Sequence, residues 1–169
     1  MTPRPVWAED LRIHLVGAQD WASHRDLRLE MLATAPEAFW GRLDEVRRLT
    51  PAQWQAAVTG PVRYLQARDT SGTAHGTLGL QPHAERDMHL VSMYVRPAAR
   101  GAGVADFLLE ASAILTREMG RDRQLLEVAR GNTAAIRLYQ RHGFTSQEPV
   151  DAADTRPLTL VRRLNLPVP

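Results

Sequence analysis

The sequence predicts a single domain of the α/β (α+β) class, in which a mixed central β-sheet of about seven strands is flanked by about four helices. Short apolar segments typical of strands recur along the chain, and segments with helical spacing of apolar residues lie between them. The 169 residues have the length of one domain, and no repeat, low-complexity segment or linker divides them. We therefore assign residues 1–169 to one domain, with its core at about 11–165.

The first half of the chain predicts one strand and two helices, in that order. Residues 12–16 alternate between polar and apolar types, as a short strand does. Asp20 is the expected N-cap of a first helix, which Pro36 ends. Thr50 and Pro51 are the expected N-cap and first residue of a second, shorter helix.

Three strands are expected next. Residues 61–69 and 75–82 flank a turn at 70–72, and this arrangement predicts a β-hairpin. Residues 88–95 are mostly apolar, which is typical of a buried central strand.

The second half predicts a helix, a strand, a helix and two strands. Apolar residues of the first helix follow a helical period: Val104, Phe107, Leu108, Ala111, Ile114 and Leu115. Residues 124–129 form the expected strand. Asn132 caps a short helix that ends at Gly143, and the last strands are expected from Phe144 and at 157–164.

Composition limits the class of protein. Hydrophobic residues make up 44% of the chain and charged residues 24%, which is ordinary for a soluble globular protein. No apolar run is long enough to span a membrane and the N-terminus lacks the apolar core of a signal peptide, so we expect a cytoplasmic protein with no membrane partner. The absence of cysteine excludes disulfides and thiolate metal sites, and the histidines show no tight spacing, so no metal is expected.

Charge argues against a nucleic-acid partner. All 21 basic residues are arginines, and the net charge is only +2. The arginines alternate with acidic residues along the chain, whereas a nucleic-acid surface needs them clustered. Without lysine the chain also lacks the Walker A motif of nucleotide-binding loops.

Residues 100–105, with the sequence RGAGVA, join the long apolar strand to a helix. The first turn of a helix has free N–H donors and a partial positive charge, and together these bind phosphate. Arg100 adds a charge, and Gly101 and Gly103 remove side chains that would block the approach. The motif alone fits a simple turn or a pyrophosphate site. It disfavours a dinucleotide fold, because the dinucleotide-binding motif is G-x-G-x-x-G and Asp106 stands at the position of the third glycine.

A second motif follows about thirty residues later, as Asn-x-x-Ala-x-x-x-Tyr-x-x-x-Gly-Phe, at Asn132, Ala135, Tyr139, Gly143 and Phe144. With YVRPAARGAGVADFLLE before it, the stretch LLEVARGNTAAIRLYQRHGF resembles the GNAT superfamily, the GCN5-related N-acetyltransferases. The first stretch fits that family's pyrophosphate loop as Arg100, Gly101, Ala102, Gly103, Val104 and Ala105. The resemblance implies a GNAT fold, acetyl-CoA as cosubstrate without a metal, and acetyl transfer to an amine.

The resemblance also implies how the cosubstrate binds. The pantetheine arm is expected to pair with backbone groups of Met93, Tyr94 and Val95, where the long strand separates from its neighbour. A backbone N–H near Met93 or Tyr94 would stabilise the oxyanion. Asn132 and Ala135, on the second motif, are further expected contacts, although Asn132 also serves as a helix cap.

Two residues are candidates for proton transfer. Tyr139 is the expected general acid, because a phenol with a pKa near 10 can protonate a thiolate; the alternative is a tyrosine that only anchors its helix. Glu127 is the expected base, acting through a water, since LEVARGN resembles the ribosomal-protein alanine acetyltransferase branch, which has a glutamate at this place. A solvated glutamate is the alternative, and His89 and Ser92 are other candidates for the base.

The resemblance places acceptor selection in the loops at 35–45 and 147–157. Aromatic and acidic residues there would suit a cationic amine, or would simply be solvated: Phe39, Trp40, Asp44, Glu45, Glu148, Asp151 and Asp154. We predict an N-acetyltransferase that acts on a primary amine of a small molecule or peptide. The alternatives are a protein N-terminal or lysine acetyltransferase and an inactive acyl-CoA-binding domain. Homodimers are common in such folds.

Overall fold

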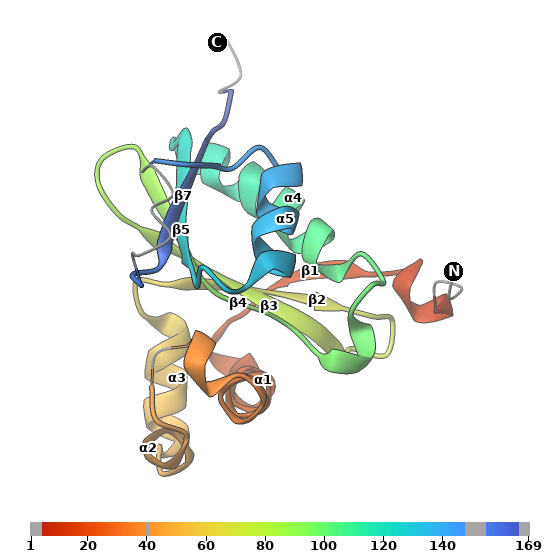
Figure 1. Cartoon of the computed structure of the whole chain (residues 1–169). Coiled ribbons are helices and arrows are strands. Elements are labelled where there is room, and N and C mark those ends of the chain that lie inside the picture. The colour runs from red at the N-terminus through yellow and green to blue at the C-terminus, as the bar shows by residue number, and fades with distance from the viewer. Residues whose placement is uncertain (1–4, 40, 148–154, 166–169) are drawn as a thin grey trace.

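The computed structural model describes residues 5–39, 41–147 and 155–165, which form one mixed β-sheet with helices on both of its faces (Figure 1). The strands are β1 (Arg12–Leu15), β2 (Arg63–Arg68), β3 (Ala74–Pro82), β4 (Asp87–Val95), β5 (Arg123–Val128), β6 (Thr145–Ser146) and β7 (Leu158–Arg163). The α-helices are α1 (Trp21–Thr34), α2 (Leu43–Arg47), α3 (Pro51–Thr59), α4 (Val104–Glu118) and α5 (Thr133–Arg141). The predicted α/β class and the seven strands are confirmed, and α2 is one helix more than predicted.

The seven strands lie in the order β1-β2-β3-β4-β5-β7-β6. The first four pair antiparallel, so the expected hairpin of β2 and β3 is confirmed. β4 and β5 pair in parallel, and α4 forms the long crossover that a parallel pair requires. β5 then pairs antiparallel with β7.

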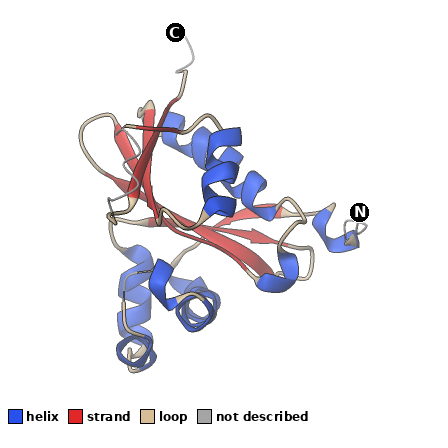
Figure 2. Cartoon of the chain, viewed as in Figure 1, coloured by secondary structure: helices blue, strands red, loops and turns tan. Residues whose placement is uncertain are grey.

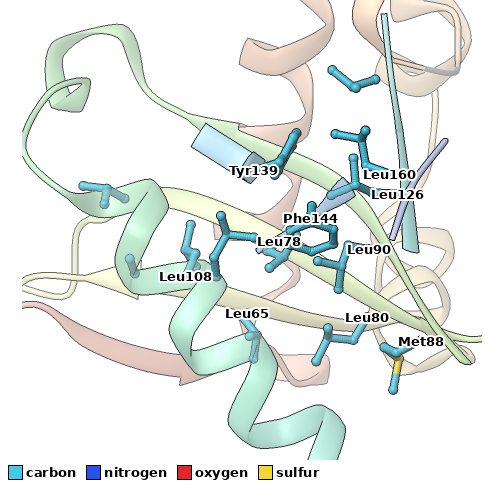
Figure 3. Packing of buried hydrophobic residues seen from close by; sticks show 14 of the residues in the cluster. Leu65, Leu78, Leu80, Met88, Leu90, Leu108, Leu126, Tyr139, Phe144 and Leu160 are labelled. Carbon is cyan, nitrogen blue, oxygen red and sulfur yellow. The ribbon is translucent and has the colours of Figure 1, made fainter. Parts of the chain in front are cut away.

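The helices divide between the two faces of the sheet (Figures 1 and 2). The main core lies between the sheet and α4 and α5, and includes Leu78, Leu108 and Phe144 (Figure 3). On the opposite face, Leu27 and Met31 of α1 pack against Tyr94 of β4 in a smaller cluster. Within the described residues, no helix combines the length and the apolar character needed to cross a bilayer.

The buried face of α4 differs from the predicted apolar stripe. Ile114 is 54% exposed, whereas Ser112 and Thr116 are completely buried. The amide nitrogen of Gln124, on β5, donates to Ser112 Oγ at 3.2 Å and to Thr116 Oγ1 at 2.7 Å. The Gln124 carbonyl accepts a 2.7 Å hydrogen bond from Nε of the buried Arg162. This network satisfies the buried polar groups, so hydrophobicity alone did not reveal which side of α4 faces the sheet.

The two N-caps predicted in the first half of the chain have different outcomes. Thr50 caps α3 as expected: Thr50 Oγ1 accepts from the Gln53 backbone, and the Gln53 side chain accepts from Thr50 N–H. Asp20 precedes α1 but does not cap it through its side chain. Its carboxylate instead accepts from the backbone of Gly17 at 2.9 Å and from Arg68 Nη2 at 3.0 Å.

Candidate active site

The central feature of the sheet is an opening between the parallel strands β4 and β5. These strands pair only at Asp87, Met88 and His89, and β4 continues for six residues beyond the last of these pairs. The paired end is held by Arg123, whose Nε and Nη2 donate to the two carboxylate oxygens of Asp87 at 2.6 and 2.5 Å. Past His89, the side of β4 that faces β5 therefore presents backbone groups that no neighbouring strand pairs.

A β-bulge bends β4 within this opening. Ser92 has a φ of 54°, a left-handed conformation that non-glycine residues seldom adopt. The pairing of β4 with β3 also shifts register, between Thr77 and Gly79. The extra residue bends β4 just before Met93 to Val95, a segment that lies beyond the last pair with β5. Met93 and Val95 pack toward the main core, and Tyr94 toward α1.

The glycine loop lies immediately after β4. Gly101 and Gly103 have φ values of 78° and 82°, and a Cβ placed on Gly101 would meet no atom within 4 Å. No hydrogen bond to an acceptor in the described residues occupies the N–H groups of Gly101, Gly103, Val104 and Ala105. Ala102 does not face this open space, because its side chain is buried in the core. Free donors, open space and the start of a 15-residue helix are together the features that phosphate-binding loops share.

Arg100 has a contact that the sequence does not indicate. Its Nε donates to the carbonyl of Val95 at 3.3 Å, so the side chain folds back along the end of β4. Arg100 is exposed, and its contact with Val95 holds the side chain beside the glycine loop. The guanidinium has further N–H groups besides the one that Val95 accepts.

The second motif begins α5 at the other side of the opening. Asn132 Oδ1 accepts from the backbone N–H of Ala135 at 3.1 Å, which confirms the predicted cap. Asn132 is exposed, whereas Ala135 is partly buried and packs against the core.

Tyr139 lies on the buried face of α5. It is 8% exposed, and its ring meets that of Phe144 edge-on at 5.7 Å between centroids (Figure 3). Burial raises the pKa of Tyr139 to about 12, so the phenol keeps its proton at neutral pH. Its hydroxyl has no hydrogen-bond partner in the part of the chain that the structure describes. Tyr139 is thus both an anchor of α5 and a protonated donor available to a ligand.

Glu127 and His89 lie at the mouth of the opening, on the face opposite Tyr139. Leu126 and Val128 belong to the main core, so the exposed Glu127 between them points toward the α1 side of the sheet. Burial lowers the pKa of His89, and the carboxylate of Glu127 acts on that pKa in the opposite direction. His89 pairs with Leu125, two residues before Glu127, so the two side chains lie on the same face of the sheet.

The predicted acceptor loops are described only in part. Phe39 packs edge-on against Tyr94, with 6.2 Å between ring centroids. Asp44 and Glu45 are exposed in the first turn of α2. Four other predicted acceptor residues lie outside the described residues: Trp40, Glu148, Asp151 and Asp154.

Sequence reasoning missed Arg28, which reaches this face of β4 from α1. Its Nη1 donates to Ser92 Oγ, in the bulge, at 3.4 Å. Arginine within a helix has no local pattern that indicates such a contact, because the bulge of β4 and the position of α1 are both long-range features.

Two other features of the described residues bear on the choice of site. The described residues contain no group of three or more histidines, aspartates and glutamates placed to hold a metal ion. An apolar groove lies beside α4, lined by Ile13, Phe107 and Ile114 among others. This groove contains none of the predicted site residues.

Comparison with known proteins agrees with this geometry. The model of the acetyltransferase (GNAT) family matches residues 19–144. A mycothiol acetyltransferase from Jonesia denitrificans is 31% identical over 126 residues, which is 75% of this chain and 34% of the relative. The chain spans 34% and 49% of the lengths of two curated mycothiol acetyltransferases that it matches.

Solved structures share the fold. A GCN5-related N-acetyltransferase from Kribbella flavida matches with a TM-score of 0.74 and 24% identity, over 92% of this chain and 99% of the other. The PaiA N-acetyltransferase from Thermoplasma acidophilum, in complex with coenzyme A, matches with a TM-score of 0.71 and 15% identity, over 91% of this chain and 99% of the other.

Proposed function

We propose that this chain, which belongs to the acetyltransferase (GNAT) family, transfers the acetyl group of acetyl-CoA to a primary amine of a small molecule or peptide. The observation that carries the proposal is the opening between β4 and β5, with unpaired backbone on one side and the glycine loop at its end. The coenzyme A bound to the Thermoplasma acidophilum relative supports the choice of cosubstrate.

The residues around the opening fit the parts of acetyl-CoA. The free N–H groups of Gly101, Gly103, Val104 and Ala105 suit the pyrophosphate, and the exposed Arg100 adds positive charge beside it. Met93 and Val95 present backbone groups that an amide-bearing pantetheine arm can pair with, as an added strand would. Asn132 and Ala135 border the same opening at the start of α5.

In the proposed reaction, Tyr139 and Glu127 act from opposite faces of the sheet. Acetyl-CoA supplies a thioester, whose carbonyl carbon the amine attacks through the opening. Glu127, on the α1 face, accepts through a water the proton that the amine must lose. The Met93 N–H donates to the carbonyl oxygen as that oxygen gains negative charge. Tyr139, on the α5 face, gives its proton to the departing thiolate and regains one from solvent.

His89 is the second candidate for the base, because one observation favours it. It is half-buried at the last β4–β5 pair, and its lowered pKa makes it neutral, and so able to accept a proton, at pH 7. Glu127 is our assignment, since it lies beside the unpaired part of the opening.

Release of free thiol from acetyl-CoA tests the proposal, measured with amino acids, polyamines, small aromatic amines and short peptides as acceptors. We expect thiol release that depends on one class of small amine or peptide. Turnover only with folded proteins or lysine side chains would favour a protein acetyltransferase, and tight CoA binding with no thiol release would favour an inactive acyl-CoA-binding domain. Cell fractionation and sedimentation test our further expectations of a cytoplasmic location and a homodimer.

A further inference from the structure

The guanidinium of Arg28 lies on the acceptor side of the opening. It contacts Ser92 Oγ in the bulge at 3.4 Å, and a Cβ placed on Gly41 would lie 3.3 Å from its Nη2. Arg28 is thus between β4 and the loop that connects α1 to α2. Ser92 directly precedes Met93, whose N–H marks the reacting carbonyl in the proposed mechanism. A group bound by Arg28 would therefore lie a few ångströms from the amine that is acetylated.

Arg28 and the neighbouring Tyr64 are partly buried. Burial lowers the pKa of Arg28, and that of Tyr64 on β2 is raised by burial. His24, one turn earlier on α1, is 5% exposed and packs on Tyr64 at 4.3 Å between ring centroids. Burial, with a smaller effect from Arg28, lowers the pKa of His24 to about 4, so His24 is neutral at pH 7. Arg28 accordingly supplies positive charge beside two neutral side chains, those of His24 and Tyr64.

We propose that Arg28 binds a carboxylate of the acceptor, so that the acceptor is a small amine with a carboxylate close to its amino group, as in amino acids. This inference rests on the proposed acetyl transfer and narrows its substrate class. A planar guanidinium forms paired, charge-assisted hydrogen bonds with a carboxylate, and such bonds are strongest where water is excluded. The same positive charge disfavours polyamines and other polycationic acceptors, in contrast to the cationic amine that the loop composition suggested.

The test compares amino acids with their carboxamides, which keep the amine and lose only the carboxylate charge. Glycine, alanine, methionine and phenylalanine and their amides are assayed by thiol release from acetyl-CoA. We expect wild-type protein to prefer an amino acid over its amide in kcat/KM. The ratio of kcat/KM for the amino acid to kcat/KM for its amide is compared between variants. The different amine pKa values of the two substrates then cancel.

Arg28→Gln should lower kcat/KM for the preferred amino acid by about ten- to a hundredfold, mainly through KM. It should change kcat/KM for the amide by less than about threefold, and Arg28→Lys should restore part of the preference. Arg25→Gln is the matched control, since Arg25 is on the same helix but its guanidinium bonds Asp26. A merely structural arginine would give equal losses for acid and amide, together with a lower Tm.

The outcomes separate this inference from the proposed function. Equal kcat/KM for amides and amino acids with the wild-type protein would overturn the role of Arg28 and leave acetyl transfer intact. An equal loss of kcat/KM for both substrates in Arg28→Gln would do the same. The wild-type comparison needs no variant, so a poorly folded Arg28→Gln protein would not prevent a decision. Thiol release with none of the amines, peptides included, would overturn both.

Discussion

Replacement of Tyr139 by phenylalanine isolates the hydroxyl that we assign as the general acid. The ring, and with it the edge-on contact to Phe144, is kept. The Tyr139 side chain is largely buried, and its hydroxyl makes no hydrogen bond within the described residues, so removal of the hydroxyl leaves no partner unsatisfied. We therefore expect the free energy of unfolding at pH 7 to change by less than about 1 kcal/mol.

The effect on catalysis should be much larger. A positioned general acid contributes about 10²- to 10⁴-fold to the rate, which sets the expected fall in kcat. The KM for acetyl-CoA should stay within about twofold, because the proposed pyrophosphate and pantetheine contacts do not involve Tyr139. Steady-state thiol release measures both constants, and calorimetry of CoA binding gives an independent control. A kcat within about twofold of the wild-type value would refute the acid role and leave Tyr139 as an anchor only.

The pKa of Tyr139 gives a second readout. Burial raises it from its ordinary value of about 10 to about 12, so the folded state holds this proton more tightly than the unfolded chain does. The resulting stabilisation is complete below pH 10 and is lost as the pH rises through about 12. The wild-type protein should therefore lose more stability than Tyr139→Phe between pH 9 and 11, as urea melts at each pH would measure.

Two further predictions concern the base and the buried network. Glu127→Gln should lower kcat/KM about 10- to 100-fold at pH 7, whereas His89→Gln should have a much smaller effect; the reverse pattern in steady-state kinetics would assign the base to His89. Gln124→Leu should destabilise the fold by about 2–4 kcal/mol, because it leaves the buried Nε of Arg162 without its acceptor. In urea denaturation the exposed Gln140→Leu is its control, and equal midpoints for the two variants would contradict the role of the network.

Features that depend on nearby residues were predicted well from the sequence. The cap of α5 by Asn132 and the capping box of Thr50 and Gln53 each need only a few neighbouring residues. The hairpin of β2 and β3 likewise follows from two apolar segments around a short turn. The motif around Tyr139 located the buried face of α5, because its spacing is itself a local pattern.

Features that depend on distant partners were not predicted. Asp20 has the right type for an N-cap, but Arg68, 48 residues away, binds its carboxylate. From the sequence, Ser112 and Thr116 would be expected on the polar, exposed side of α4. They are buried because Gln124 of β5 donates hydrogen bonds to both. Arg28 lies at the site because it contacts Ser92, which is 64 residues away in the sequence. Neither composition nor periodicity contains these pairings.

The measurement that tests the central claim most directly is thermal melting with acetyl-CoA, for the wild-type protein and two glycine variants. Gly103→Glu puts bulk and negative charge in the loop that we assign to the pyrophosphate, at a φ of 82°. Gly120→Glu is its control, because Gly120 has a similar φ of 71°, follows the other end of α4 and has open space around its Cβ. Both variants carry comparable backbone strain and the same added charge.

Acetyl-CoA at a hundred times its Kd should stabilise the wild-type protein and Gly120→Glu by about 2.7 kcal/mol, a rise in Tm of a few degrees. The same concentration should leave the Tm of Gly103→Glu unchanged, and NAD should shift none of the three proteins. This pattern would establish that the glycine loop binds the CoA pyrophosphate. No shift in the wild-type protein, or an equal shift in Gly103→Glu, would contradict the account.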